Sequence, residues 1–360
     1  MKTLRNNNVM KMIKKTTRRF ILFILLTINL TVVAQDIHFS QFYMSPLTQN
    51  PAMAGVNHDL QAIVNYKEQW KSVSIPYNTI AASFDMRLTK KSRSGFLAVG
   101  INLFNDKSGS SEMVTSQANL SIAYHIQLAK FQTLGAGIQG GFFQRSINTT
   151  SLQWGNQYVN NAYNTSAPTG EMSGNYSFSK LDCGAGLVWN YNNMSGNSNV
   201  TGNQDLRFTA GFSTMHINRP NYSYLANSDQ RLSMRQTLYG NALIGISNSK
   251  ISIAPGFIYN RQGKSNELYF GAMVRKKLQQ ESKVTGANKG SAISLGAFYR
   301  VKDALAFAVL YEFSQFAVGM SYDVNLSHLN MASKSRGGLE LSLRFVNPHP
   351  FLNKSQSRFH

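Results

Sequence analysis

The sequence predicts an all-β protein, a transmembrane β-barrel of the outer-membrane type with about 14 antiparallel strands. Three observations predict it. Apolar residues alternate with small or polar residues along most of the chain, which is the period-2 signature of β-strands. Only 14% of the residues are charged, whereas soluble globular domains have about 25%. After residue 34 no apolar run approaches the ~20 residues that a membrane-spanning helix needs.

Residues 1–34 are expected to be a secretory signal rather than part of the fold. Seven lysines and arginines, with no acid, precede an apolar stretch at Phe20–Val33, and small or β-branched residues lead to a cleavage site after Ala34. We therefore expect export by the general secretory pathway. Removing the signal lowers the net charge from +20 to about +13. The remaining basic residues are scattered over strand ends and turns, so we interpret them as loop and rim charge, not as a nucleic-acid surface.

Residues 35–59 form a segment without strand alternation. Between His38 and Gly55 there is no acidic or strongly basic residue, and aromatic and amide side chains are frequent, which is not the composition of a disordered linker. Pro46 and Pro51 prevent a regular helix or a central strand from running through them. Because the segment follows an export signal, we expect it to start in the periplasm and to pack irregularly into the periplasmic half of the barrel lumen, as a plug.

Residues 60–346 are predicted to form the barrel, and residues 347–360 a periplasmic tail. The clearest alternation lies near the end of the barrel, where Leu305, Phe307, Val309 and Tyr311 share one face and small residues share the other. Small residues suit the interior of a closed barrel. The predicted strands lie near residues 60–68, 79–88, 95–104, 117–127, 132–144, 181–191, 205–215, 234–246, 250–260, 266–276, 291–300, 304–313, 315–323 and 337–345.

Closure of the barrel follows from the solvent, because lipid cannot satisfy the backbone groups of an open sheet edge. An even number of strands leaves both ends of the barrel chain in the periplasm. The long polar segments should then be extracellular: residues 145–180, 216–231 and 325–336. The short connections at 128–131, 248 and 314 should be periplasmic, together with two longer ones at 192–204 and 278–289.

Signals for catalysis are poor. The seven histidines are dispersed, no phosphate-binding loop or metal-ligand spacing is present, and we predict no enzyme, cofactor or metal. His125 should point into the lumen, and Cys183, the only cysteine, should be a small residue on the apolar face. Four charged residues are predicted to face the lumen, either neutralising one another or acting as a selectivity filter. They are Glu312, Asp323, Glu340 and Arg344.

The segment after the signal also carries a specific motif. Its residues are Gln35-Asp36, Phe39-Ser40-Gln41-Phe42, Ser45-Pro46-Leu47 and Asn50-Pro51-Ala52-Met53-Ala54-Gly55. Further matches follow in order: Gln69-Trp70, Asn105-Asp106-Lys107-Ser108-Gly109, Phe298-Tyr299-Arg300 and Met320-Ser321-Tyr322-Asp323. The pattern resembles the PorP/SprF family of type IX secretion-system membrane proteins, which is common in the Bacteroidetes. Ile37 and Met53 replace the usual Pro and Tyr, residues 278–289 look inserted, and the chain runs past Phe345, where the family often stops.

The resemblance implies a non-enzymatic role in type IX secretion or gliding motility. Members of the family accompany large secreted adhesins with an SprB-like C-terminal domain and support their secretion or surface anchoring. Expected partners are type IX secretion components, such an adhesin, a peptidoglycan-binding OmpA-like protein and outer-membrane lipid. The motif residues from Phe39 to Gly55 would form a plug or a partner contact. A passive or ligand-specific channel resembling fatty-acid transporters is the alternative, since small lumenal residues also permit a conduit.

Overall fold

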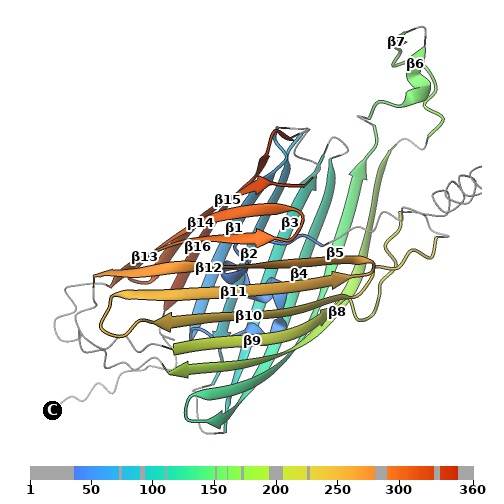
Figure 1. The fold of residues 1–360 in the computed structure, drawn as a ribbon. Helices are drawn as coiled ribbons and strands as arrows, with labels where there is room; N and C mark the ends of the chain where they lie inside the picture. The colour runs from blue at the N-terminus through green and yellow to red at the C-terminus, as the bar shows by residue number, and fades with distance from the viewer. Residues whose placement is uncertain are drawn as a thin grey trace, which may run out of the picture. The chain divides into compact units, whose positions relative to one another are not determined.

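Fourteen antiparallel strands close into a barrel, as the sequence predicted (Figure 1). The computed structural model describes residues 36–72, 75–89, 94–109, 112–150, 152–159, 161–171, 174–193, 206–224, 228–279, 290–327 and 333–347. The barrel strands are β1 (Leu60–Gln69), β2 (Tyr77–Arg87), β3 (Phe96–Ser108), β4 (Met113–Ala129), β5 (Gln132–Asn148), β8 (Asn175–Asn193), β9 (Leu206–Met215), β10 (Arg235–Gly245), β11 (Ile251–Gln262), β12 (Ser265–Gln279), β13 (Ser291–Arg300), β14 (Ala304–Phe313), β15 (Phe316–Asn325) and β16 (Arg336–Asn347).

Each strand pairs with its neighbours in the chain, and β1 pairs with β16 to close the sheet, from Leu60 opposite Asn347 to Gln69 opposite Gly338. Two short strands, β6 (Tyr158–Val159) and β7 (Ala162–Tyr163), form a separate hairpin in the connection between β5 and β8. A closed sheet leaves no edge, which is the condition for backbone to cross lipid.

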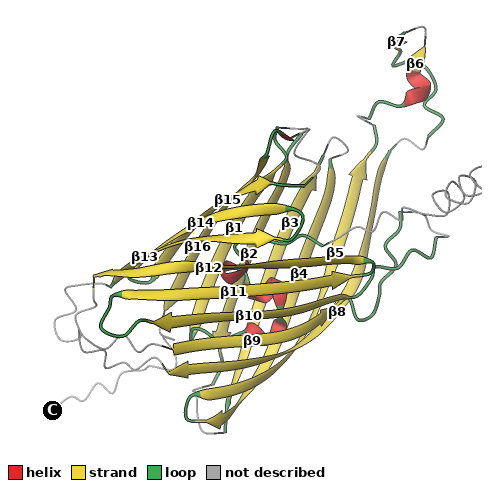
Figure 2. Cartoon of the chain, viewed as in Figure 1, coloured by secondary structure: helices red, strands yellow, loops and turns green. Residues whose placement is uncertain are grey.

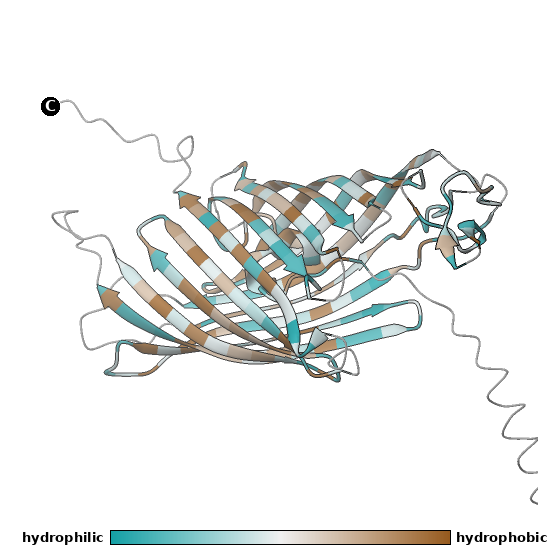
Figure 3. Cartoon of the chain, turned by 90° about the horizontal axis from the view of Figure 1, so that it is seen from above, coloured by the Kyte–Doolittle hydropathy of each residue, from teal (hydrophilic) through white to brown (hydrophobic). Residues whose placement is uncertain are grey.

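The strand faces are those predicted from the alternation. In β15, Ala317, Ser321 and Asp323 are each 2% exposed, whereas Val318 and Met320 are 44% and 49% exposed. Figure 3 shows the same change of hydropathy from residue to residue along the strands. The outward apolar residues form a lipid-compatible surface, and the inward residues are small or polar. His125 is buried on the lumen side, and Cys183 is exposed on the outward side, as predicted.

The two ends of the barrel differ in their connections. At the end where β1 begins and β16 ends, here called the turn end, β4–β5, β10–β11 and β14–β15 are joined by the predicted short turns. The opposite end, the loop end, carries residues 149–174, 216–234 and 326–335. The first loop is shorter than the predicted 145–180 because β5 and β8 continue beyond their alternating cores. The even-strand rule predicts that the turn end is periplasmic and the loop end extracellular.

Several predicted features lie outside the described residues. They are the signal at 1–34 with its cleavage site, the tail beyond Asn347, and nearly all of the longer connections at 192–204 and 278–289. Within the described part of the chain, no helix has the length and apolar character needed to cross a membrane.

Candidate functional site

Residues 36–59, here called the N-terminal segment, lie inside the ring of strands. The segment forms three short helical turns: η1 (Phe42–Met44), α2 (Pro46–Gln49) and η2 (Pro51–Met53) (Figure 2). The two prolines each occupy the first helical position, where their fixed φ is favourable and the missing N–H costs nothing. Asn50 caps η2, since its side chain accepts a hydrogen bond from Ala52 N at 2.8 Å.

The N-terminal segment spans the length of the lumen. Asp36 contacts residues at the loop-end limits of β9, β10 and β11, whereas Gly55 bonds to Asp85 near the turn end of β2 at 2.9 Å. The expectation that the segment fills only one half of the lumen is therefore wrong. With the orientation that the even-strand rule predicts, Asp36 lies at the extracellular end and not in the periplasm. The segment runs from the loop end to the turn end, and local sequence carries no information about which end of a lumen a segment enters.

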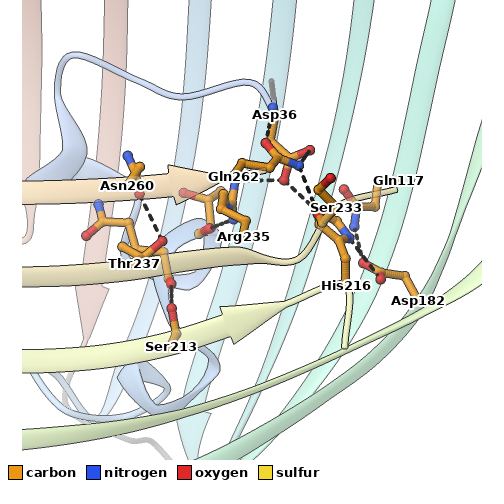
Figure 4. A network of polar contacts seen from close by, with 12 residues as sticks. Asp36, Gln117, Asp182, Ser213, His216, Ser233, Arg235, Thr237, Asn260 and Gln262 are labelled. Carbon is orange, nitrogen blue, oxygen red and sulfur yellow. Dashed lines mark hydrogen bonds and ion pairs between the residues drawn. The ribbon is translucent and has the colours of Figure 1, made fainter. Parts of the chain in front are cut away.

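At the loop end the segment is held by a polar cluster, here called the Asp36 latch (Figure 4). The Asp36 carboxylate lies 2.6 Å from His216 Nε2 and 3.2 Å from Arg235. The other ring nitrogen of His216 lies 2.9 Å from Asp182 on β8. Gln262 completes the latch, because its amide oxygen accepts from Asp36 N at 2.8 Å and its amide nitrogen donates to the Asp36 carboxylate at 3.1 Å.

The latch is a charged one near neutral pH. Burial by itself would lower the pKa of His216, but Asp36 and Asp182 outweigh burial and raise that pKa to about 9. Burial would likewise raise the pKa of Asp36, yet His216 and Arg235 hold it well below its usual range. His216 is therefore an imidazolium between two carboxylates, and it donates from both nitrogens.

Further along the segment, Ser40 and Gln41 contact a network of buried charges. Glu340 accepts hydrogen bonds from Ser40 N at 2.7 Å and from Gln41 N at 2.9 Å, and its carboxylate lies 2.9 Å from Lys67 Nζ. The Ser40 hydroxyl donates to Asp323 at 2.7 Å, and Arg300 donates to the same hydroxyl at 2.8 Å. Ser40, Arg300 and Asp323 come from three separate motif stretches of the sequence, and the fold brings them into contact.

His38 differs from His216 in its protonation. Burial lowers the pKa of His38 to about 4, so the imidazole is neutral at pH 7. Its 3.1 Å contact with Glu267 is then a hydrogen bond rather than an ion pair. The His38 carbonyl accepts a hydrogen bond from Lys67 at 2.7 Å.

The apolar side chains of the segment occupy pockets in the wall. The Phe42 ring packs edge-on against Tyr269 and Phe298, with centroids 5.8 Å and 5.7 Å away. Leu47 is fully buried and lies where a Cβ on Gly100 would be 2.8 Å from its Cδ1. Burying each large apolar side chain contributes roughly 1.5–3 kcal/mol, so these contacts stabilise the segment against the wall.

Inward-facing glycines of the wall make room for the part of the segment around Asn50 and Ala52. A Cβ at Gly137 on β5 would lie 2.5 Å from the Ala52 backbone nitrogen, and one at Gly186 on β8 would lie 2.0 Å from Asn50 Oδ1. The Asn50 amide donates to the Leu187 carbonyl at 2.8 Å. The wall residues here are therefore as small as the close approach of the segment requires.

Small cavities lie beside the segment. Two of them have volumes of about 30 Å³ and 20 Å³. A cavity needs about 10–15 Å³ to hold one water molecule, so each of these holds one or two. The first lies between the segment and the wall formed by β3, β4, β5 and the loop-end parts of β8, β9 and β10.

The secondary motif lies apart from the segment, at the loop end of the first strands. Trp70 packs edge-on against Tyr77, with ring centroids 4.7 Å apart. Asn105 bonds to Ser116. Asp106 accepts from Thr79 at 2.7 Å, and Lys107 pairs with Glu112 at 2.9 Å. These contacts brace hairpin ends.

The four lumenal charges predicted from sequence do not form one cluster. Glu312 is shared by Arg344, at 3.2 Å, and Arg275, at 2.6 Å, while Asp323 and Glu340 pair with Arg300 and Lys67. Lys67 and Arg275 were not predicted from the sequence, and Arg300 and Asp36 were noted only as motif residues. The partners of Asp36 in the latch were not predicted either. Lys67, Arg275 and Arg300 could have been predicted as lumenal, because each lies on the inward face of an alternating strand.

His125, a side chain that could take part in catalysis elsewhere, makes packing and hydrogen-bond contacts in the lumen. His125 Nε2 lies 2.9 Å from the Ala54 carbonyl, and its ring stacks on Phe96 at 4.4 Å. In the part of the chain that the structure describes, no group of three or more His, Cys, Asp or Glu residues could hold a metal ion.

Fold and site together define a class: a β-barrel of the outer-membrane type whose interior is occupied by its own N-terminal segment. The chain belongs to the PorP/SprF family of type IX secretion system membrane proteins, whose model matches residues 31–345. It is accordingly an outer-membrane barrel of the type IX secretion system. No curated protein matches the chain.

Several solved barrels are similar to the chain at low sequence identity. The CymD monoaromatic hydrocarbon channel is 11% identical with a TM-score of 0.41, covering 85% of this chain and 93% of its own. A FadL homologue from Pseudomonas aeruginosa is 9% identical with a TM-score of 0.42, covering 82% and 92%. The KdgM porin is 7% identical with a TM-score of 0.32, covering 79% and 99%.

Proposed function

We propose that this barrel is a non-enzymatic component of the type IX secretion or gliding machinery that supports the secretion or surface anchoring of a large adhesin with an SprB-like C-terminal domain. Family membership carries the proposal. The lumen supports it, because a barrel filled by its own segment is better suited to binding partners than to passing solutes. A peptidoglycan-binding OmpA-like protein on the periplasmic side would connect the barrel to the rest of the machinery.

Gene deletion tests this role. Removing the gene, together with any paralogue, should abolish surface display of one large adhesin while other type IX cargo is still exported. Surface proteomics of intact cells measures both. Normal display of every SprB-like cargo in the deletion strain would contradict the proposal. Re-expression of the wild-type chain should restore display and serves as the control.

We also propose that the N-terminal segment closes the lumen to solutes. The two small cavities beside it support this view over the channel alternative. Deleting Phe39–Leu47 should produce measurable conductance in planar bilayers, whereas deleting the equally long stretch 162–170 from the β5–β8 loop should not. A deletion variant that stays closed but no longer displays the adhesin would instead assign the segment to a partner interface.

A further inference from the structure

The wall of the barrel holds the N-terminal segment largely through the segment's main chain. Carbonyl oxygens along the segment accept hydrogen bonds from strand side chains, and three of its N–H groups donate to carboxylates. The carbonyl contacts are His38 with Lys67, Met44 with Asn65, Thr48 with Arg235, Gln49 with Ser213, Ala54 with His125 and Gly55 with Arg87. The N–H contacts are Ser40 and Gln41 with Glu340, and Gly55 with Asp85. Contacts of this kind recognise any peptide that follows the same path.

Selectivity among peptides comes from a few pockets at fixed spacing. Phe42 enters an aromatic pocket beside Gly256, and Leu47 fits over Gly100. The Asn50 amide reaches the carbonyls of Leu187 and Phe212, at 2.8 Å and 3.3 Å, and the Tyr239 hydroxyl at 3.3 Å. Ala52 is fully buried with its main chain close against Gly137, so a larger side chain at this position would have to displace its neighbours. The wall therefore reads the pattern Phe-x4-Leu-x2-Asn-x-Ala.

The barrel does not need the segment to complete its sheet. Each of the fourteen strands is paired on both sides by other barrel strands, β1 with β2 and β16 included, and the segment contributes no strand. Removing the segment exposes lumenal side chains but opens no sheet edge. Residues 56–59, the last four of the segment, lead into β1, and the latch at the other end is held by hydrogen bonds and ion pairs.

We propose that the lumen is a peptide-binding site, occupied in cis by the chain's own segment, which also takes in trans a peptide with the Phe42, Leu47, Asn50 and Ala52 spacing. This deepens the proposed filling of the lumen and is independent of the cargo that the machinery exports. The bound peptide runs with its N-terminal end toward the loop end. Glu340 and Lys67 bind its main chain, and the Asn50 pocket provides the most specific contact.

A cut chain tests the proposal with every residue present. A protease site inserted between Asn57 and His58 is cleaved, the two pieces are unfolded in urea, and the barrel is refolded into detergent with a large excess of fluorescent synthetic peptide 36–57. The labelled peptide should migrate with the folded barrel on an unboiled gel. An Asn50→Ala peptide should compete about tenfold more weakly, because it leaves buried partners without a hydrogen bond. An Asn57→Ala peptide, altered outside the pockets, should compete like the native one.

Three results would overturn the inference. One is a refolded barrel that carries no labelled peptide, and another is a scrambled peptide that is incorporated as well as the native one. The third is a cut chain that fails to refold with any peptide under conditions in which the uncut chain refolds. Refolding that requires the native peptide and fails with the scrambled one would support the site. None of these results depends on conductance or adhesin display, so they are separable from the proposed function.

Discussion

At the scale of single residues, the lumen shows how a barrel can hold charges that lie almost fully buried. Glu340 is 1% exposed, and its carboxylate meets one ammonium and two backbone N–H groups. A buried ion needs such complete pairing because its desolvation penalty is several kcal/mol. Two of the three donors to Glu340 are the backbone N–H groups of Ser40 and Gln41 in the N-terminal segment. The segment therefore stabilises the buried carboxylate, and the carboxylate in turn holds the segment.

The Lys67–Glu340 pair gives a stability prediction. Lys67→Met leaves the Glu340 carboxylate without its cation and should cost about 3–5 kcal/mol. The double variant Lys67→Met, Glu340→Gln removes the unpaired charge and should recover part of the loss. Urea titration, followed by the gel shift between folded and boiled forms, measures both. A single variant as stable as the wild type would mean that water, rather than Lys67, compensates the carboxylate.

The Asp36 latch gives a pH prediction. Because the pKa of His216 is raised to about 9 from an ordinary 6.5, its contribution is complete below pH 6.5 and is lost as pH rises through 9. Asp36 has a lowered pKa, so its contribution is present above its ordinary pKa of 3.8 and is lost only in stronger acid. The latch should hold best at about pH 5–6 and loosen by pH 10.

Hydrogen exchange of the amides of residues 36–41 measures the loosening. Exchange in these residues should be more strongly enhanced between pH 6 and pH 10 than the chemical rate alone accounts for. A His216→Gln variant should exchange faster at pH 6 and lose the additional pH dependence. Equal protection of the wild type at the two pH values, after correction for the chemical rate, would contradict a charged latch.

At the scale of elements, the strands followed from the sequence and the lumenal contacts did not. Alternation is a local property, and it located every barrel strand, with both ends correct at Ser291–Arg300 and Ala304–Phe313 and the largest error at the start of β8. Strand ends were extended, as in β8, where polar residues continue the pairing beyond the apolar core. The Ser40–Glu340 bond joins residues 300 positions apart, and no local pattern encodes such a pair or the end from which a segment enters.

Two glycines on β5 allow a matched test of how the segment fits the wall. Gly137→Ala places a Cβ 2.5 Å from the Ala52 backbone nitrogen, whereas a Cβ at Gly140 meets nothing within 4 Å. Gly137→Ala should cost about 1–3 kcal/mol and increase proteolytic cleavage within residues 42–55. Gly140→Ala should change neither quantity. Equal effects of the two substitutions would mean that β5 responds to lost backbone freedom and not to contact with the segment.

At the scale of the whole molecule, the path of the N-terminal segment has a topological consequence. The barrel chain begins and ends at the turn end, which the even-strand rule assigns to the periplasm. The segment nevertheless places Asp36 beside His216 and Gln262 at the loop end. Since the sheet is closed, the segment must enter the lumen before the last strands pair or thread through it afterwards. In either case Asp36 itself lies at the end of the barrel that the even-strand rule assigns to the cell surface.

Epitope accessibility on intact cells tests this arrangement. An epitope inserted immediately before Asp36 should bind an external antibody, because the segment carries its first residues through the lumen to the loop end. The same epitope placed after Asn347, where β16 ends at the turn end, should be detected only after the outer membrane is permeabilised. The reverse result would show that the barrel is inserted with the opposite orientation. Failure to detect either epitope on intact cells, with both detected after permeabilisation, would show that Asp36 does not reach the cell surface.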